Sequence, residues 1–136
     1  MKYEDFKLEI IKRSKKSNAC GKELTKAEKA SSIEELFSVI SDNFNYSCVN
    51  GVIDVSLLTE LGIDICNQHS FFVNQSTDRG FLISDSATVE ASGSATVEAW
   101  GSAYINSYNS IEHKISERVI LRYYYENRVV LGYSIK

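Results

Sequence analysis

The chain has 136 residues, of which 43% are hydrophobic and 24% are charged, a composition typical of globular proteins and not of disordered ones. This length suits one ordinary domain or two small cooperating modules. The N-terminal segment lacks the apolar stretch of a signal peptide, and no apolar run approaches the length of a membrane span. The three cysteines are odd in number and widely spaced, unlike a secreted disulfide scaffold, so we expect a cytoplasmic protein that does not associate with membranes.

Charge is distributed unevenly along the chain, although the net charge is only -3. Residues 1–30 hold nine Lys and Arg against five Asp and Glu, whereas residues 31–117 hold two against twelve. Residues 118–136 hold four against one. The acidic middle argues against direct DNA binding by that segment, because it would repel phosphates. It fits either a solvated face or a partner with a basic surface.

The first 62 residues follow the 3.6-residue apolar period of amphipathic helices. The sequence Ser32-Ile-Glu-Glu35 is a capping box, in which the Ser32 hydroxyl and the Glu35 carboxylate satisfy free helix amides. Asp54 or Ser56 is expected to cap one further short helix. We therefore predict a helical cap module over residues 1–62.

From Gly62 onward the apolar period changes to two, which is the period of β-strands. From residue 85 the chain repeats in octads, and the first two read D-S-A-T-V-E-A-S and G-S-A-T-V-E-A-W. A fixed short period predicts one structural unit stacked on copies of itself. Turns are expected at Gly93, Gly101 and Asn109, which tolerate positive φ. The odd-numbered positions are predicted to face inward, and they include Ile63, Ile65, Phe71, Val73, Phe81, Ile83, Val89, Val97, Ile105, His113, Val119, Leu121, Tyr123, Val129, Leu131 and Tyr133.

Small residues flank a central Val or Ile on the inward side of each octad, which leaves room only for a thin core between two close faces. We therefore predict an α+β fold in which a short β-solenoid over residues 63–136 packs on the helical cap as one cooperative unit. Two octads per coil would place Glu98 beside Lys114, and three would place Glu90 beside Lys114, so the sequence leaves both open. An antiparallel β-meander is the alternative architecture.

Few residues suggest chemistry. Cys66 and His69 have the spacing of half a zinc site, which Cys20 and Cys48 would have to complete. The alternative is that these cysteines are small buried apolar groups. His113 falls on an inward column and is expected to be a neutral, hydrogen-bonded histidine. Because no catalytic motif is present, we assign no enzymatic activity, no cofactor and no metal.

The aromatic residues near the turns are the strongest candidates for binding. Ser92, Trp100, Tyr108 and Tyr124 share one position of the octad, next to the turn, where large rings either cover the core or act as anchors. We predict a protein-binding surface in which an acidic face meets a basic groove. Its predicted members are Glu90, Glu98, Trp100, Tyr104, Tyr108 and Glu112.

The motifs S-A-T-V-E-A, Y-I-N-S-Y-N-S-I-E-H-K-I-S with the following V-I-L-R, and K-A-S-S-I-E-E-L-F-S-V-I-S-D-N-F-N resemble a family of small proteins from gut bacteria and their mobile elements. That resemblance implies a helical N-terminal module, β-solenoid repeats and a phage or prophage origin. Small acidic phage proteins are often inhibitors of host defence, including anti-CRISPR proteins, which implies action in the host cytoplasm.

We therefore expect a non-enzymatic protein that occludes a surface of a nucleic-acid-processing defence complex. The alternatives are a self-assembling structural protein, which would form homo-oligomers, and a small metal-binding protein or enzyme.

Overall fold

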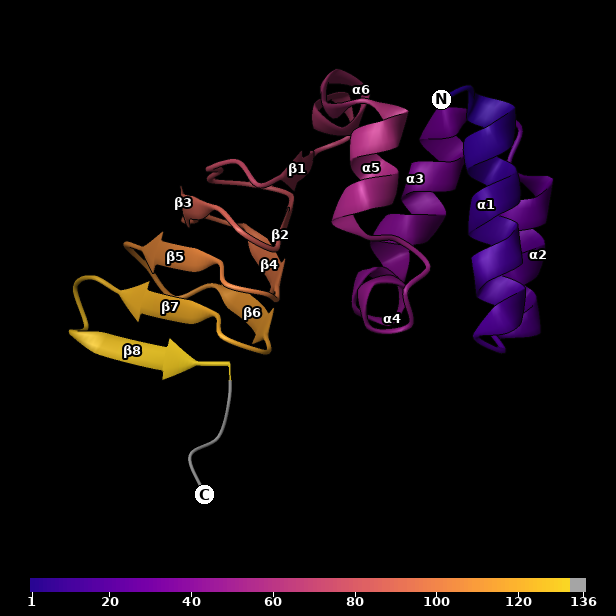
Figure 1. Cartoon of the computed structure of the whole chain (residues 1–136). Coiled ribbons are helices and arrows are strands. Elements are labelled where there is room, and N and C mark those ends of the chain that lie inside the picture. Colours follow the sequence, from indigo (N-terminus) through magenta and orange to yellow (C-terminus); the bar gives the residue numbers. More distant parts are fainter. Residues whose placement is uncertain (133–136) are drawn as a thin grey trace. The chain divides into compact units, whose positions relative to one another are not determined.

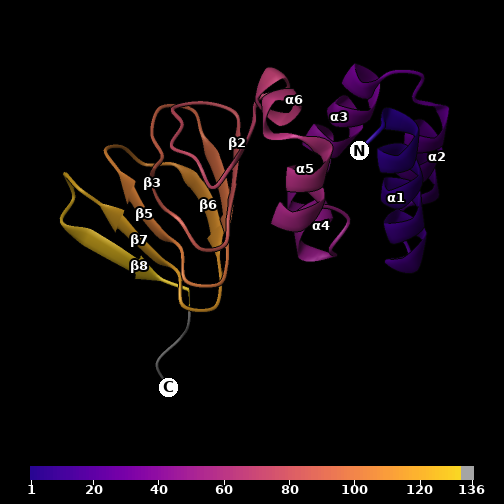
Figure 2. The same ribbon diagram turned by 45° about the horizontal axis from the view of Figure 1, so that its top comes forward.

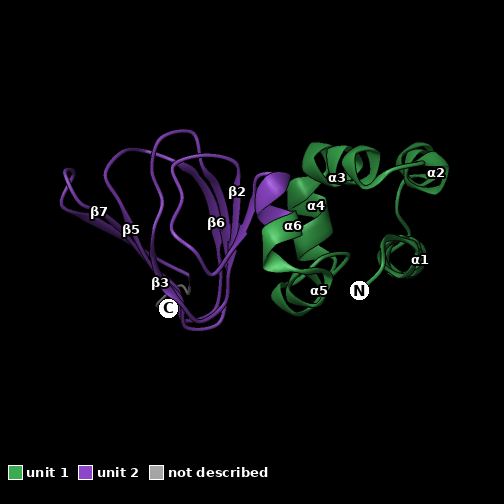
Figure 3. Ribbon diagram, turned by 90° about the horizontal axis from the view of Figure 1, so that it is seen from above, with its two compact units in different colours: residues 1–65 green, residues 66–136 purple. Residues whose placement is uncertain are grey.

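The computed structural model describes residues 1–132 and shows an α+β protein in which helices precede strands along the chain (Figure 1). The described residues form six helices and two four-stranded sheets. The predicted inward position Tyr133 lies outside them. The chain divides into two compact units, one of residues 1–65 and one from residue 66 onward (Figure 3). No helix within residues 1–132 is long and apolar enough to cross a bilayer.

Side-chain caps start two of the helices in the first unit. The Ser32 half of the predicted capping box is confirmed, because Ser32 Oγ accepts a hydrogen bond from the Glu35 N–H at 3.2 Å. The Glu35 carboxylate reaches back to the N–H of Ser31 at 2.7 Å, one residue before the cap. Asp54 caps the last helix of this unit by accepting from the Leu57 N–H at 2.7 Å. The helices that lie wholly within the unit are α1 (Tyr3–Lys16), α2 (Gly21–Lys29), α3 (Ile33–Asp42), α4 (Phe44–Val49) and α5 (Val55–Leu61).

The apolar stripes of these helices are buried, as their period predicts. The rings of Phe6 in α1 and Phe37 in α3 stack with centroids 5.8 Å apart. Leu8, which the helical period places off the stripe, is 65% exposed. The buried apolar residues of the unit are Phe6, Ile10, Ala27, Ala30, Leu36, Phe37, Ile40, Phe44, Val52, Ile53, Leu57, Leu58 and Leu61.

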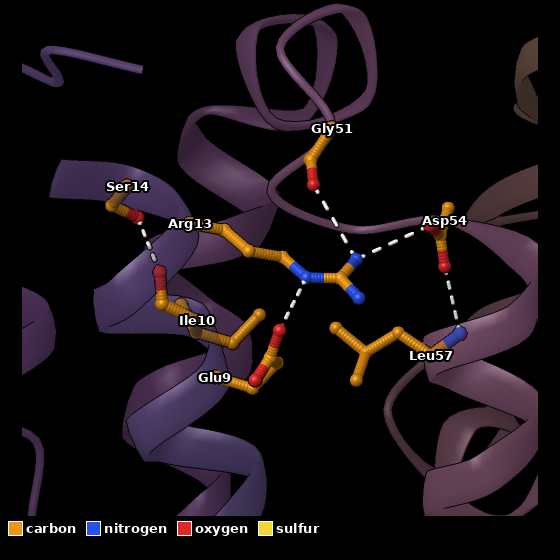
Figure 4. A network of polar contacts seen from close by, with 7 residues as sticks. All are labelled: Glu9, Ile10, Arg13, Ser14, Gly51, Asp54 and Leu57. Atoms are coloured by element: carbon orange, nitrogen blue, oxygen red, sulfur yellow. Dashed lines mark hydrogen bonds and ion pairs between the residues drawn. The ribbon is translucent and has the colours of Figure 1, made fainter. Parts of the chain in front are cut away.

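Arg13 ties α1 to the segment that leads into α5 (Figure 4). Its guanidinium donates to Glu9 Oε1 at 2.9 Å and to Asp54 Oδ2 at 3.2 Å. A longer contact of 3.4 Å reaches the carbonyl oxygen of Gly51. The hydrogen bond from Arg13 lowers the pKa of the Glu9 carboxyl, since it stabilises the charged form. Asp54 therefore serves two elements, because one oxygen caps α5 and the other binds Arg13.

The prediction that strands begin after Gly62 is wrong for the first six residues. Ile63–Gln68 form a helix, α6, in which Cys66 is buried. The alternation of Ile63 and Ile65 is too short to separate the helical period from the strand period. The strand region instead begins at Phe71.

The strands of the second unit form two sheets, and from β2 to β7 successive strands alternate between them (Figure 2). Every pairing is parallel except that of β7 with β8, so the alternative of an antiparallel β-meander is wrong. Sheet 1 contains, in order, β1 (Phe71–Val73), β2 (Phe81–Ser84), β4 (Thr96–Ala99) and β6 (Glu112–Ile115). Sheet 2 contains β3 (Thr88–Glu90), β5 (Tyr104–Ser107), β7 (Ile120–Tyr123) and β8 (Arg128–Leu131).

Between β3 and β5, between β5 and β7 and between β4 and β6, the register joins residues two octads apart. Glu98 pairs with Lys114 in sheet 1, and Glu90 pairs with Asn106, which pairs with Arg122, in sheet 2. These are the pairs expected if two octads complete one turn of the chain, and the three-octad alternative is wrong. Neighbouring octads therefore lie in different sheets.

The inner faces of the two sheets share one apolar core. His113 lies beside Val97 in the register, and its Nδ1 lies 2.7 Å from the Tyr123 hydroxyl. The hydrogen bond expected for His113 is thus confirmed, but its side chain is only partly buried and is not among the core residues. The buried residues of this core are Leu82, Val89, Ala91, Ala95, Val97, Ala99, Ala103, Ile105, Ile111, Val119, Leu121 and Tyr123.

The predicted inward phase is wrong at the beginning of the strand region. In β2 the even-numbered Leu82 faces the core, whereas the odd-numbered Ile83 is buried outside this cluster. The cause is the spacing between β2 and β4, where Phe81 pairs with Thr96, fifteen residues later instead of sixteen. Because side chains alternate along a strand, this one-residue difference exchanges the two faces.

The phase is also wrong at the end of the chain. Val129 and Leu131 were expected to face inward, yet they are 54% and 38% exposed. Strand β8 returns antiparallel after a turn, which pairs Val130 with Leu121. That pairing brings an even-numbered residue opposite an odd-numbered one, so Val130 packs on the core instead.

Two of the predicted turn positions have the expected conformation. Gly93 and Gly101 have φ of 60° and 68°, and a Cβ on Gly101 would overlap the carbonyl oxygen of Asp85. Asn109 does not have positive φ, contrary to expectation. Its side chain instead forms hydrogen bonds with the turn at Gly93. Its Oδ1 accepts from the Gly93 N–H at 2.7 Å, and its Nδ2 donates to the Gly93 carbonyl at 3.0 Å.

Candidate functional site

Three exposed tyrosines form a cluster just after the C-terminal ends of β5 and β7 in sheet 2. The ring centroid of Tyr108 lies 5.4 Å from that of Tyr124 and 5.9 Å from that of Tyr125. Tyr124 and Tyr125 meet edge to face at 5.5 Å. The three side chains are 41%, 49% and 77% exposed, respectively. We call these residues the tyrosine cluster.

The two-octad register explains why the tyrosine cluster forms. Tyr108 follows β5 and Tyr124 follows β7, and the pairing of Ser107 with Tyr123 places them side by side. The N–H of Tyr124 donates to the carbonyl of Ser107 at 2.8 Å, which fixes this position. Tyr125 joins them because the chain turns immediately afterwards toward β8, with Asn127 at a φ of 48°.

Two charged groups contact the tyrosine cluster. The Tyr108 hydroxyl donates to Glu90 Oε1 at 3.3 Å, and the negative charge of Glu90 raises the pKa of Tyr108. The Arg122 guanidinium lies over the ring of Tyr124, 5.0 Å from its centroid. Both residues lie on the outer face of sheet 2, because the adjacent Val89 and Leu121 face the core. The surface therefore combines aromatic rings with one acidic and one basic group.

The neighbouring Tyr123 is buried and makes its own contacts. The Tyr123 hydroxyl donates to the carbonyl of Ile111 at 3.2 Å, and the Arg128 guanidinium lies over the Tyr123 ring at 4.5 Å. A small pocket of about 90 Å³ opens between Tyr108, Tyr125 and Glu126.

The structure does not unite the predicted binding residues on one face. Sheet 2 contains Glu90 in β3 and Tyr104 in β5, and Tyr108 follows β5. Tyr104 is partly buried on the outer face of that sheet. Glu98 and Glu112 lie in β4 and β6 of sheet 1. The half-buried Trp100 follows β4, so it belongs to a different corner from Tyr108. The expectation of one acidic face formed by Glu90, Glu98 and Glu112 is wrong, because adjacent octads enter different sheets.

Glu98 also differs from the outward, solvated position that the repeat predicts. Its side chain is only 5% exposed, and its Oε1 has no hydrogen-bond partner among the described residues. Burial raises the pKa of Glu98 to about 7, and the nearby Lys114 opposes this shift. Glu98 is thus a buried carboxyl and not part of an exposed acidic surface, whereas Glu112 is exposed.

The residues considered for a zinc site differ widely in exposure. Cys20 is exposed, Cys48 is partly buried and Cys66 is buried. Burial raises the pKa of the Cys66 thiol to about 11, which disfavours the thiolate that binds metals. Within residues 1–132, no three histidine, cysteine or carboxylate residues gather in a metal-binding arrangement.

The predicted set of binding residues left out Tyr124, Tyr125 and Arg122, although Tyr124 was considered with Tyr108 as a ring next to the turn. Tyr108 and Tyr124 are sixteen residues apart, which is two octads. A register of two octads would therefore have predicted that these two tyrosines lie side by side. No sequence pattern marks Tyr125, whose position depends on the turn before β8.

Comparison with protein-family models, with curated proteins and with solved structures finds no match to this chain. The family resemblance drawn from the repeat motifs therefore stays a prediction.

Proposed function

We propose that this chain is a non-enzymatic protein-binding protein that uses the tyrosine cluster and the adjoining outer face of sheet 2 as its binding surface. The observation that carries the proposal is the packing of three exposed rings on one another. Tyrosine rings supply large contact areas at low entropic cost, and they are enriched among the residues that dominate binding energy.

The scaffold supports this role because its backbone is fixed before any partner arrives. We propose that the two sheets are the faces of a short β-solenoid with two octads per coil. The parallel ladder that joins Ser107 to Tyr123 fixes the strands that carry Tyr108 and Tyr124. A surface held in its binding conformation loses little entropy on association.

The partner surface best suited to this site is basic. Glu90 is exposed and lies against Tyr108, and aromatic rings attract Lys and Arg side chains through their faces. The guanidinium of Arg122 already occupies such a position over Tyr124. A basic groove of a nucleic-acid-processing defence complex has this chemistry, so we propose a phage- or mobile-element-encoded inhibitor, of the anti-CRISPR kind, that occludes such a groove.

The experiment is an affinity pull-down of the tagged chain from lysate of its host cells, read by mass spectrometry at low and high salt. Replacing Tyr108 and Tyr125 together with Ala should reduce recovery of the main partner at least about tenfold. The matched control is Tyr46→Ala, which removes an exposed tyrosine from the helical unit and should leave recovery unchanged.

The charge on the surface is tested separately. Glu90→Arg should abolish the salt-sensitive part of the recovery, because it would repel a basic partner. A partner that binds the double tyrosine variant and Glu90→Arg as well as the parent chain would contradict the proposed surface.

A further inference from the structure

The terminal strands of the two sheets differ in the side chains they present. Strand β6 ends sheet 1 and carries the exposed Glu112 and Lys114, and charges of this kind discourage pairing with another chain. Strand β8 ends sheet 2 and carries Val129 and Leu131, which are 54% and 38% exposed. Among the residues that the structure describes, no strand pairs with the outer edge of β8.

The ladder between β7 and β8 shows which backbone groups point toward that edge. The Gly132 N–H donates to the Val119 carbonyl at 3.0 Å, so residue 132 is bonded toward β7. Hydrogen bonding alternates along an antiparallel strand. The backbone N–H and C=O groups of Val129 and Leu131 therefore point away from β7.

We propose that two copies of this chain associate by antiparallel pairing of their β8 strands across a twofold axis. In this arrangement Val130 lies opposite Val130 of the second copy, and Val129 lies opposite Leu131 of the second copy. Each Val129–Leu131 pair exchanges two backbone hydrogen bonds, so the outward groups of both residues are satisfied. Sheet 2 then continues from one copy into the other.

This register follows from the geometry of β8. Residues directly opposite one another must lie on the same face of the sheet, so only registers that match odd with odd and even with even are allowed. The neighbouring allowed register, with Val129 opposite itself, would pair Leu131 with Asn127. Asn127 has a φ of 48° and lies in the turn, where it cannot continue a strand. The register centred on Val130 pairs residues 129–131 with one another, and all three lie in β8.

The same register joins apolar side chains into one stripe. Val129 and Leu131 lie on the outer face of sheet 2, where Leu131 pairs with Ile120 and Val129 with Arg122. Pairing with a second copy places the Val129 and Leu131 side chains of the two copies in one stripe. Their mutual contacts remove exposed apolar area from water. Arg128 would lie opposite Gly132 of the second copy, so no like charges face each other.

Sedimentation equilibrium of the full chain over a range of concentrations tests the proposal, and it should show a reversible monomer–dimer equilibrium. Val129→Lys places a charge in the paired edge. Because the twofold axis makes each substitution count twice, it should weaken the dimer about a hundredfold. The matched control is Thr88→Lys, which adds the same charge at an exposed site in β3 and should leave the dimer intact.

A cross-link keeps the proposal testable if Val129→Lys fails to fold. Directly opposite residues that do not share hydrogen bonds have Cα atoms about 4.5 Å apart, which a disulfide can bridge. In a Cys20→Ser background, Val130→Cys should therefore form a covalent dimer on mild oxidation. A chain that stays monomeric at every concentration, or a dimer that Val129→Lys does not weaken and Val130→Cys does not cross-link, would overturn the pairing.

The self-association is independent of the proposed partner binding. Replacing Tyr108 and Tyr125 with Ala should leave the dimer unchanged, while Val130→Cys, whose side chain packs on the core side of sheet 2, should cross-link whether or not the chain recovers a partner. Failure of one inference is thus distinguishable from failure of the other.

Discussion

Two octads of identical core sequence have different surroundings in this molecule. The segments 86–91 and 94–99 both read S-A-T-V-E-A, and the central Val89 and Val97 are both buried in the core between the sheets. The carboxyls differ, because Glu90 in sheet 2 is exposed whereas Glu98 in sheet 1 is 5% exposed. The repeat therefore determines which side chains enter the core, but the sheet determines what the outward side chains meet.

The largest expected effect comes from changing the number of octads. Duplicating residues 93–108 adds one full coil and returns each later strand to its own sheet, so we expect a melting temperature within about 5 °C of the parent. Duplicating residues 93–100 alone would place the strands of Asn106 and Arg122 in the sheet that holds Glu98. We expect this to cost about 5 kcal/mol, or 20 °C or more in melting temperature.

Thermal unfolding followed by circular dichroism compares these two chains. Equal melting temperatures for the eight-residue and sixteen-residue duplications would show that the outer faces of the two sheets are interchangeable, contrary to this expectation.

The turns at Gly93 and Gly101, in contrast with the outer faces of the sheets, should respond equally to substitution. A Cβ at Gly93 or at Gly101 would overlap a carbonyl oxygen of the preceding coil, that of Asp78 or of Asp85, and both glycines have positive φ. We expect either substitution by Ala to lower the free energy of unfolding by about 3–4 kcal/mol.

Gly51→Ala is the control for the backbone conformation alone. Gly51 has a φ of 69°, but a Cβ added to it would meet no other atom within 4 Å, so its substitution should cost only about 1 kcal/mol. Urea titration measures all three variants. A loss at Gly93 or Gly101 no greater than that at Gly51 would argue against close stacking of the coils.

The buried carboxyl of Glu98 should make stability depend on pH. Burial raises the pKa of Glu98 in the folded state from the ordinary value of 4.5 to about 7, so protonation of Glu98 stabilises the folded state relative to the unfolded state. Its favourable contribution is complete below pH 4.5 and is lost as the pH rises through 7. At pH 9, Glu98→Gln should therefore be more stable than the parent by about 3 kcal/mol, and this difference should vanish near pH 4.

Denaturant titration at pH 4 and pH 9 provides the measurement. Glu90→Gln, which makes the same change in the exposed octad, should alter the free energy of unfolding by less than about 0.5 kcal/mol at either pH. A pH-independent difference for Glu98→Gln would contradict the burial of this carboxyl.

The smallest effect is expected at the exposed hydrogen bond between Tyr108 and Glu90. Tyr108→Phe removes the donor but keeps the ring and its contacts with Tyr124 and Tyr125. We expect a change of less than about 0.5 kcal/mol in stability, because water replaces the lost partner. A larger loss in urea titration would mean that the tyrosine cluster stabilises the fold and is not only a surface for binding.

Local patterns allowed several features to be predicted from the sequence. The Ser32 hydroxyl cap, the inward Val89 and Val97, and the positive φ of Gly93 and Gly101 depend on neighbouring residues, and each is confirmed. The sequence left open whether two or three octads complete one turn, because either number places opposite charges side by side. The observed pairing of Glu98 with Lys114 is the one expected for two octads.

Features that depend on distant parts of the chain could not be predicted in the same way. The fifteen-residue spacing between Phe81 and Thr96 exchanges the faces of β2, and nothing in the alternation of β2 reveals it. The burial of Glu98 is invisible in an octad that it shares with the exposed Glu90. The tyrosine cluster likewise required the coil length, since only that length brings Tyr108 beside Tyr124.

The most direct test of the account is a nuclear Overhauser experiment on the full chain in solution. Two octads per coil predict strong cross-peaks between Ile105 and Leu121 and between the rings of Tyr108 and Tyr124, which lie sixteen residues apart in each case. Cross-peaks between Val97 and Leu121 of adjacent paired strands, twenty-four residues apart, in place of these would contradict the register. The same result would separate the tyrosines and remove the surface on which the proposed function rests.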